Sequence, residues 1–326
     1  MTKCAIHSVA LTGATGFIGR HVTADLIARG IDVRAVVRPE SQHHVDGRAA
    51  VVRAPLESGP LQTAFAGVDA VVHLAGVVNS IDETVYTAVN VDGTRAVAQA
   101  AAAVGAHLVH VSSLAAAGPA PASAPRSEDD APSPRTPYGH SKLDGERLVT
   151  ATAGLSWTIL RPGVVYGPGD RALLPLFKCA EIGLLPLVGR RDAGYMFVHV
   201  QDVVRTIAAA LEAGGDGQLM FVGHPRPATP LDVLEAIRLA VGRSAVVIRI
   251  PQALTRLAST ACDLIAPALG RPLPLNRWRW VELSAEGFSC RVDRLRERLG
   301  IVAAIALREG FAQTAGWYRQ EGWIRR

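Results

Sequence analysis

Short apolar runs alternate with amphipathic stretches over the first half of the chain. The runs, each typical of a buried strand, lie at Ala5–Leu11, Val33–Val37, Ala50–Val52, Ala70–Leu74, Leu108–Val111 and Thr158–Leu160. The stretches between them have helical patterns and lie at Ile18–Arg29, Leu61–Phe65, Glu83–Val104 and Tyr138–Ala151. Strands that are apolar on both faces and alternate with helices are typical of βαβ units. The pattern therefore predicts an α/β fold with a doubly wound parallel sheet covered by helices on both faces.

The regular alternation stops near residue 165. Beyond it, expected helices and short strands are mixed, at Leu173–Ile182, Val200–Ala213, Gln218–Val222, Pro230–Val241 and Val246–Ile250. This change predicts a sheet domain over residues 1–165 and a smaller portion over residues 166–326 that folds against it and can return elements to the sheet. Within the sheet domain, the segment Gly118–Pro137 is rich in Pro, Ala and Ser. A loop of that length inside a compact domain is usually functional.

Composition narrows the class of protein without identifying it. The chain has 326 residues, of which 49% are hydrophobic and 19% charged, as in a globular protein. Its formal net charge of +5 suits an anionic cofactor or substrate and does not indicate nucleic acid binding. We find neither a secretion signal nor an apolar stretch of membrane-spanning length, so we expect a cytoplasmic protein with no membrane partner. The four cysteines lack metal-ligand spacing, so we expect no metal.

A glycine-rich turn joins the first expected strand to the first expected helix. Gly13, Gly16 and Gly19 have no Cβ, which keeps the turn tight and lets the backbone approach a pyrophosphate. The start of the helix offers backbone N–H groups and the positive end of its dipole to phosphates. The turn therefore predicts a nicotinamide dinucleotide site whose contacts are Gly13, Thr15, Gly16, Phe17, Ile18 and Gly19.

The end of the second expected strand indicates which dinucleotide binds. In NAD-specific sheets an acidic side chain near this position accepts hydrogen bonds from the ribose 2′-hydroxyl. Here the strand ends in Val37 and Arg38, with no carboxylate. An arginine can form a charge-assisted pair with a 2′-phosphate. We therefore expect NADP(H) to be favoured over NAD(H), although a solvated surface arginine is the alternative interpretation of Arg38.

A tyrosine and a lysine open the last expected helix of the sheet domain. Tyr138 and Lys142 are one turn apart and share a face. A cation one turn away favours the phenolate, so Tyr138 can exchange a proton with a substrate hydroxyl. Ser113 ends the fifth expected strand, where ligands bind in such sheets, and can hydrogen-bond a substrate oxygen. We predict that these three residues are catalytic; each alone is also compatible with a structural role.

Taken together, these residues resemble the extended short-chain dehydrogenase/reductase family, also called the NAD-dependent epimerase/dehydratase family. Its ordered motifs include Thr12 to Gly19, His73 to Gly76, Asn90 to Thr94, Val111 to Ser113, Tyr138 to Lys142, Arg161 to Gly169, Val198 to Asp202 and Glu309 to Tyr318. The resemblance implies a Rossmann domain with a small substrate domain, a tyrosine acid/base, and a lysine that also holds the nicotinamide ribose. It places further residues beside the cofactor: Leu56, Leu74, Ala75, Gly76, Tyr138, Lys142, Pro162 and Gly163. It also implies a homodimer through the helices at Glu83–Val104 and Tyr138–Ala151.

Departures from the family pattern bear on the substrate. Leu114-Ala115 replaces the acidic pair of sugar-nucleotide dehydratases, while Gly163 and Tyr195 replace an Asn and an Arg that often hold the nucleotide diphosphate in epimerases. The nearer resemblance is to the dihydroflavonol-reductase-like and 3β-hydroxysteroid-dehydrogenase-like branches. Two apolar segments, 173–177 and 184–188, can line a hydrophobic pocket or form core. Pro55 replaces an Asp that contacts adenine in the family, which would weaken that contact.

These observations leave three functions open. The first is an NAD(P)-dependent oxidoreductase that interconverts a secondary alcohol and a ketone on a non-nucleotide, apolar small molecule. In it Tyr138 is the acid/base and Ser113 orients the oxygen. The second is a nucleotide-sugar 4-epimerase, which would use the same residues. The third is a non-catalytic dinucleotide-binding protein, which the presence of Ser113, Tyr138 and Lys142 disfavours.

Overall fold

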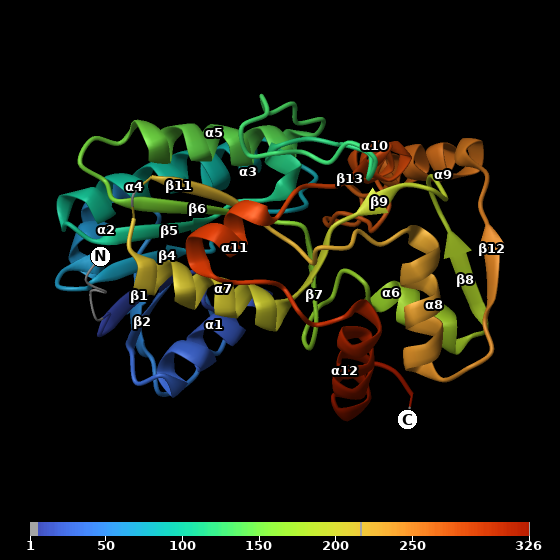
Figure 1. The fold of residues 1–326 in the computed structure, drawn as a ribbon, viewed down its shortest axis with the longest axis horizontal. Helices are drawn as coiled ribbons and strands as arrows, with labels where there is room; N and C mark the ends of the chain where they lie inside the picture. The colour runs from blue at the N-terminus through green and yellow to red at the C-terminus, as the bar shows by residue number, and fades with distance from the viewer. Residues whose placement is uncertain (1–5, 216, 326) are drawn as a thin grey trace.

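Seven parallel strands form the central sheet of the protein. The computed structural model describes residues 6–215 and 217–325, so the start of the expected strand at Ala5 lies outside the described residues. The strands are β1 (Ser8–Thr12), β2 (Asp32–Val37), β3 (Ala50–Arg53), β4 (Ala70–His73), β5 (His107–Val111), β6 (Trp157–Pro162) and β11 (Gln218–Val222). Their order is β11-β6-β5-β4-β1-β2-β3 (Figure 1). The chain runs outward from β1 to β3 and returns to β4 on the other side of β1. This reversal confirms the predicted doubly wound, Rossmann-type sheet.

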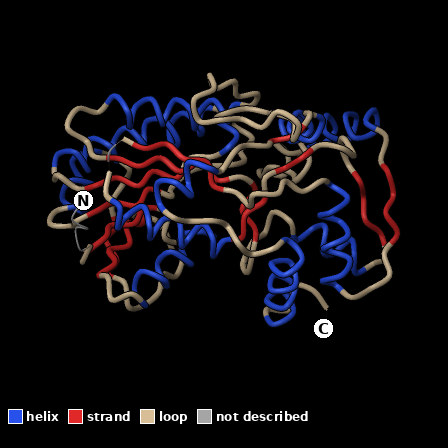
Figure 2. Tube along the Cα trace, viewed as in Figure 1, coloured by secondary structure: helices blue, strands red, loops and turns tan. Residues whose placement is uncertain are grey.

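Helices cover both faces of this sheet, as Figure 2 shows. One face carries α1 (Phe17–Ala28) and α7 (Val200–Ala213), which pack together; the other carries α2 (Ser58–Phe65), α4 (Gly93–Ala103) and α5 (Pro137–Ala151). Successive strand residues point to opposite faces. Along β1, Leu11 therefore joins the core beneath α1 and α7, whereas Ala10 joins the core beneath α2 and α4. The near-continuous apolar runs in the sequence reflect this burial on both faces.

The expected helix at Glu83–Val104 is interrupted. It consists of α3 (Thr84–Tyr86), a π-helical turn η1 (Thr87–Asp92) and α4. A π-helical turn inserts extra backbone and is frequent at functional sites. The prediction of one continuous helix was wrong here, because apolar periodicity does not distinguish an α-helical turn from a π-helical one.

The C-terminal half both extends the sheet domain and builds a smaller portion beside it. Strand β11, α7 and α11 (Asp293–Leu299) pack with the sheet. The remaining elements are β7 (Val164–Tyr166), α6 (Leu174–Glu181), β8 (Leu184–Leu187), β9 (Gly194–Tyr195), β10 (Phe197–His199), α8 (Pro230–Val241), β12 (Val246–Arg249), α9 (Gln252–Ile265), α10 (Arg277–Ser284), β13 (Gly287–Phe288) and α12 (Leu307–Gln320). The sequence pattern did not predict α9, α10 or α11.

An aromatic cluster forms the core of the smaller portion. Tyr166 and Phe177 each pack edge-to-face with Phe311, and Phe177 also packs edge-to-face with Tyr318. All of these side chains are almost completely buried. Leu185 and Leu187 belong to the same core. The apolar segments 173–177 and 184–188 could line a pocket or form core. Phe177, Leu185 and Leu187 from these segments form core. No helix of the described part of the chain is long and apolar enough to cross a membrane.

The long segment Gly118–Pro137 is held by the C-terminal portion. Ala120 and Arg126 form parallel bridges with Phe288 and Cys290. The Glu128 carboxylate accepts a hydrogen bond from the Phe221 backbone N–H, 3.0 Å away, on edge strand β11. The segment therefore connects the edge of the sheet to the smaller portion before it enters α5.

Candidate active site

The glycine-rich turn lies at the carboxyl end of β1, beside the carboxyl end of β4. Gly13 has φ +78°, and a Cβ there would lie 2.6 Å from the Ala75 backbone nitrogen. A Cβ on Gly19 would collide with the Gly13 carbonyl oxygen. Both positions therefore require glycine. Gly16 caps α1 without a side-chain hydrogen bond, and the first turn contains no acidic residue. The turn thus presents backbone donors suited to an anionic diphosphate, so it fits a dinucleotide.

Other predicted cofactor residues surround this turn. The Leu74 N–H donates to the Thr12 carbonyl oxygen at 3.1 Å, which joins the chain after β4 to the end of β1. A Cβ on Gly76 would lie 3.2 Å from Asn90 Oδ1. Leu56 packs against the start of α4, since a Cβ on Gly93 would lie 2.9 Å from its Cδ1. The structure therefore gathers these predicted residues around the carboxyl ends of the central strands.

Arg38 lies exposed just beyond β2. Its Nε is 3.6 Å from Glu40 Oε1, and both side chains are about two-thirds exposed. Arg53 donates to the carbonyl oxygens of Pro39 and Ser41, at 2.9 and 2.8 Å, and so shapes this loop. Glu40, two residues after Arg38, is thus a weak, exposed ion-pair partner of its guanidinium. A bound phosphate would compete with this carboxylate.

Ser113 and Tyr138 meet at the carboxyl end of β5. Thr136 caps α5 by accepting a hydrogen bond from the Gly139 N–H at 3.1 Å, and Pro137 begins the helix. Tyr138 is thereby placed in the first turn, where its phenol forms a hydrogen bond with the Ser113 hydroxyl. Lys142, one turn later, is buried, and its Nζ donates to the Val111 carbonyl oxygen at 3.0 Å. The structure therefore brings the three predicted catalytic residues to one strand end.

Burial controls the protonation of this pair. It raises the pKa of Tyr138 to about 12, although the hydrogen bond with Ser113 acts in the opposite direction. Burial lowers the pKa of Lys142 to about 8, opposed by the Glu146 carboxylate. The sequence led us to expect that Lys142 favours the phenolate, but Lys142 is not among the groups that act on the pKa of Tyr138, and desolvation raises it. Tyr138 is protonated at neutral pH.

A buried polar network supports the site from below. The Thr94 hydroxyl donates to the Asn90 carbonyl oxygen at 2.7 Å. It can therefore only accept from His73 Nε2, 3.0 Å away, which leaves His73 Nδ1 to accept from the Thr12 hydroxyl at 2.7 Å. Burial holds the pKa of His73 at about 3, so the ring is neutral. These residues lie in three of the sequence motifs, which by themselves predict no role for them.

Asn90, within the π-helical turn, ties the segment after β4 to α5. Its Oδ1 accepts from the Val77 N–H at 2.8 Å, and its Nδ2 donates to the Val77 carbonyl oxygen and to Ser141 Oγ, both at 2.9 Å. Ser141 lies three residues after Tyr138. Asn90 is fully buried and uses both ends of its amide. It therefore positions the helix that carries Tyr138.

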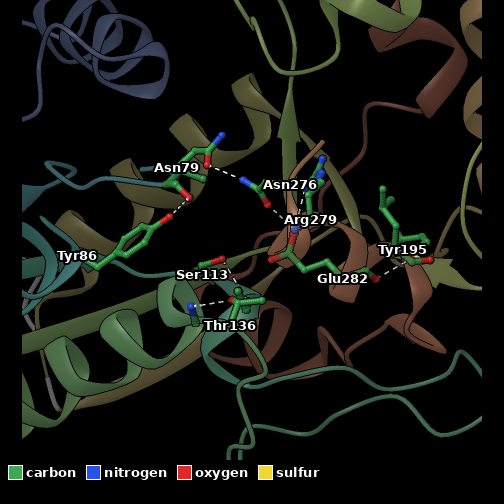
Figure 3. Close-up of polar contacts among 12 residues, drawn as sticks. Asn79, Tyr86, Ser113, Thr136, Tyr195, Asn276, Arg279 and Glu282 are labelled. Atoms are coloured by element: carbon green, nitrogen blue, oxygen red, sulfur yellow. Dashed lines mark hydrogen bonds and ion pairs between the residues drawn. The ribbon is translucent and has the colours of Figure 1, made fainter. Parts of the chain in front are cut away.

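Figure 3 draws Tyr86 of α3, Tyr195 of β9 and Glu282 of α10 together with Ser113. The Tyr86 ring lies 6.4 Å from that of Tyr138. The Tyr195 hydroxyl donates to the carbonyl oxygens of Glu282 and Leu283, each 3.3 Å away. The charge of Glu282 contributes to the raised pKa values of both Tyr138 and Tyr195. Only Tyr195 drew attention in the sequence, because no local motif marks the others.

The position where related epimerases often carry Asn is sterically closed. A Cβ on Gly163 would collide with the Met196 carbonyl oxygen, and the Val164 N–H donates to that same oxygen at 2.7 Å. Glycine is therefore required by the close approach of β7 to the segment between β9 and β10. The neighbouring Pro162 ends β6.

Three comparisons with known proteins extend these observations. The sequence profile described as NAD dependent epimerase/dehydratase family matches residues 9–223. The chain is 30% identical over 321 residues to a ceramide reductase of Caulobacter vibrioides, covering 97% of this chain and 96% of that protein. It is 28% identical to a UDP-glucose 4-epimerase of Mycolicibacterium smegmatis, covering 95% and 98%. Among solved structures, MoeE5 in complex with UDP-glucose and NAD is similar with a TM-score of 0.77 and 25% identity, covering 96% of this chain and 99% of that one.

Proposed function

Because the chain belongs to the NAD dependent epimerase/dehydratase family and is therefore an enzyme, we propose that it interconverts a secondary alcohol and a ketone on an apolar, non-nucleotide substrate. The observation that carries this proposal is the convergence of Ser113, Tyr138 and Lys142 on the carboxyl end of β5, where Ser113 acts on the pKa of Tyr138 and Lys142 bonds the Val111 carbonyl oxygen. The glycine-rich turn follows β1 and Ser113 follows β5. Both therefore lie at the carboxyl edge of the sheet, on either side of β4. Residues 166–326 would supply most of the substrate-binding surface.

The glycine-rich turn and its neighbours are proposed to hold the cofactor. Gly13, Gly16 and the first turn of α1 would receive the diphosphate, and Lys142 would hold the nicotinamide ribose. Arg38 favours NADP(H), because its guanidinium can pair with a 2′-phosphate once Glu40 is displaced. When bound, the nicotinamide supplies the hydride in reduction or accepts it in oxidation.

The protein residues would move the proton. In reduction the Tyr138 hydroxyl donates its proton to the carbonyl oxygen of the substrate, and the Ser113 hydroxyl hydrogen-bonds the same oxygen. The Lys142 ammonium, one helical turn away, would stabilise the resulting phenolate. Because the pKa of Tyr138 is about 12, the phenol is ready to act as an acid at neutral pH.

The surroundings of the pair support an uncharged substrate. Glu282 brings a carboxylate toward the reacting residues, where it would repel the diphosphate of a nucleotide sugar, although its ion pair with Arg279 at 3.2 Å weakens this effect. Tyr195 occupies the place of an arginine, and Gly163 leaves no room for an amide side chain. The similarity to a ceramide reductase over nearly the full chain also favours an apolar alcohol or ketone.

A nucleotide-sugar 4-epimerase is the second candidate. It is favoured by the similarity to a UDP-glucose 4-epimerase and to MoeE5 bound to UDP-glucose and NAD. A thermal-shift comparison separates the two candidates: NADPH and NADH are each added alone and with UDP-glucose. We expect NADPH to raise the melting temperature and UDP-glucose to add nothing. Stabilisation by UDP-glucose would instead establish the epimerase.

The catalytic proposal is tested by Tyr138→Phe. We expect the variant to lower kcat for NADPH-dependent reduction of a panel of lipophilic ketones by about 10²–10⁴-fold, the usual contribution of a positioned acid. NADPH should still raise its melting temperature as in the wild type. Tyr86→Phe is the matched control, because its hydroxyl accepts from the Ser80 N–H at 3.0 Å and has no proposed catalytic role. Wild-type turnover by Tyr138→Phe would refute the mechanism.

A further inference from the structure

Helix α9 turns its apolar face outward. Thr255 and Ser259 are 3% and 2% exposed, whereas large apolar side chains on the other face are half or more exposed: Leu254 57%, Leu257 66%, Leu264 77% and Ile265 50%. A helix on the surface of a globular protein normally buries its apolar stripe and exposes its polar one. In α9 this arrangement is inverted, so the apolar face has no partner within the described chain.

Polar contacts to α10 hold α9 in this orientation. The Asp263 carboxylate accepts from the Arg277 backbone N–H at 3.0 Å. The Arg256 guanidinium lies over the Trp280 ring, 5.6 Å from its centroid. Thr255 and Ser259 bond to backbone carbonyls within the helix. The polar groups on the buried face of α9 therefore have hydrogen-bond partners. Because the contacts with α10 set the orientation of α9, its leucines face outward.

The apolar surface continues onto the neighbouring two-stranded sheet. Strand β12 leads through Pro251 into α9, and it pairs with β8 at the same end of the molecule (Figure 1). Val246 and Ile248 on β12 are 65% and 44% exposed, and Ile182, just before β8, is 70% exposed. We call α9 together with β8 and β12 the apolar end.

Positive charge gathers on the same stretch. Residues 243–282 contain six arginines and two acidic residues, Asp263 and Glu282, a net charge of plus four. Arg277 and Arg279 form ion pairs with Glu83 and Glu282. Within the described chain the remaining four arginines form no ion pair: Arg243, Arg249, Arg256 and Arg271. An exposed apolar helix face among arginines is the pattern of helices that lie in the interface of anionic lipid bilayers.

We propose that the apolar end docks on the surface of an anionic lipid bilayer, with the leucines of α9 inserted among the acyl chains and the surrounding arginines on the lipid phosphates. This docking is peripheral and needs no spanning helix. It revises the expectation of no membrane partner, which considered only apolar segments of spanning length. A second copy docked through the same face is disfavoured, because it would bring two clusters of arginines together.

Docking would place the candidate active site close to the lipid. Helix α9 packs on α10, which carries Glu282 toward Tyr138. An apolar substrate dissolved in the bilayer could therefore reach the site from the side covered by α10. The docking itself does not depend on the proposed reaction, so it can be tested without any substrate.

The test is flotation of the full-length protein with vesicles, compared with a double variant, Leu257→Glu with Leu264→Glu. We expect the wild type to float with vesicles of equal parts phosphatidylcholine and phosphatidylglycerol, to float less with phosphatidylcholine alone, and to be released by high salt. The double variant should lose at least roughly tenfold in binding, since it removes apolar contact and adds like charge to that of the lipid. Leu239→Glu on α8, also 50% exposed, is the control that should float like the wild type.

Two results would overturn the proposal. One is failure of the wild type to float with the phosphatidylglycerol vesicles. The other is equal loss of flotation in the double variant and the Leu239→Glu control. Light scattering in the absence of vesicles identifies the competing occupant: a wild-type oligomer that the double variant dissociates, without vesicle binding, would assign the apolar end to a second copy. Melting temperatures of all variants establish that each is folded.

Discussion

At the scale of single residues, Lys142 shows how burial sets a chemical property. Its ammonium is 4% exposed, bonds the Val111 carbonyl oxygen, and has its pKa lowered from 10.5 to about 8. A group with such a pKa changes charge within the working range of an enzyme. Glu146, which forms a buried bidentate pair with Arg161, is the only carboxylate that counteracts this shift among the described residues.

We predict that kcat/KM for reduction falls above about pH 8, because Lys142 then loses its charge. Lys142→Arg should move this alkaline limb to higher pH, since a guanidinium stays protonated. Titration of Lys142 cannot cause this fall in kcat/KM by unfolding the protein. Its pKa is lower in the folded than in the unfolded chain, so its contribution to the free energy of unfolding rises between about pH 8 and 10.5. If kcat/KM of Lys142→Arg falls at the same pH as that of the wild type, a group other than Lys142 causes the fall.

The second prediction for a single residue concerns Arg38 and the affinity for NADPH relative to NADH. Arg38→Ala should raise the Kd of NADPH roughly tenfold, as expected for loss of one charge-assisted hydrogen bond, and leave that of NADH almost unchanged. Arg48→Ala is the control, because Arg48 is a surface arginine engaged with Asp46. Fluorescence titration measures both constants. Equal weakening of NADPH and NADH would show that Arg38 acts through the fold of the loop.

At the scale of elements, the contact between η1, α4 and α5 positions the helix that carries Tyr138. Asn90 in the π-helical turn holds Ser141, and Thr94 closes the hydrogen-bonded chain that begins at Thr12. The two helices approach closely because α5 has Gly145 at the contact. A Cβ there would lie 2.7 Å from the Asn90 carbonyl oxygen. A helix interior normally disfavours glycine, so its presence here reflects packing.

We predict that Gly145→Ala lowers the free energy of unfolding by about 1–3 kcal/mol, because the methyl group forces α5 away from the backbone of η1. Gly316→Ala in α12 is the matched control. A Cβ at Gly316 meets nothing within 4 Å, so alanine should stabilise that helix by about 0.5–1 kcal/mol. Urea denaturation measures both. Opposite signs for the two variants support the packing explanation, whereas stabilisation by Gly145→Ala would contradict it.

At the scale of the whole molecule, a few exposed contacts connect α10 to the sheet domain beside the site. Glu83 Oε1 accepts from Arg277 Nη2 at 2.6 Å and from Trp278 Nε1 at 3.1 Å. Asn276 Nδ2 donates to Asn79 Oδ1 at 2.9 Å. These partners lie far apart in the sequence and join the segment around α3 to α10, as Figure 3 shows for the two asparagines. They determine how the smaller portion sits against the catalytic pair.

We predict that Glu83→Ala raises KM several-fold and changes the free energy of unfolding by less than about 1 kcal/mol, because an exposed ion pair adds little to stability. The expected rise in KM follows from loosening α10 above the site. Asp92→Ala, which removes an exposed ion pair with Arg95 on the sheet domain, should change neither quantity. Steady-state kinetics measures KM, and denaturation measures the free energy of unfolding. An unchanged KM in Glu83→Ala would show that the ion pair of Glu83 does not position α10.

The fold was predictable because its signals are local. The alternation of buried strands with helices, the glycines of the first turn and the spacing of Tyr138 and Lys142 all lie within a few residues of one another. Such patterns follow directly from the geometry of strands and helices. Helix α9 was missed although its apolar periodicity is helical. The face that it buries was not predictable, because that depends on its contacts with α10.

The sequence by itself therefore determined the doubly wound sheet, the family and the residues that gather at the carboxyl ends of the strands. Tertiary structure alone decided the properties that depend on burial and on distant partners. It raised rather than lowered the pKa of Tyr138, and it brought Glu282 of α10 near enough for its charge to contribute to that rise. It also left the leucines of α9 facing outward. Desolvation and electrostatic interaction depend on how the whole chain is packed, so no local pattern of residues could specify them.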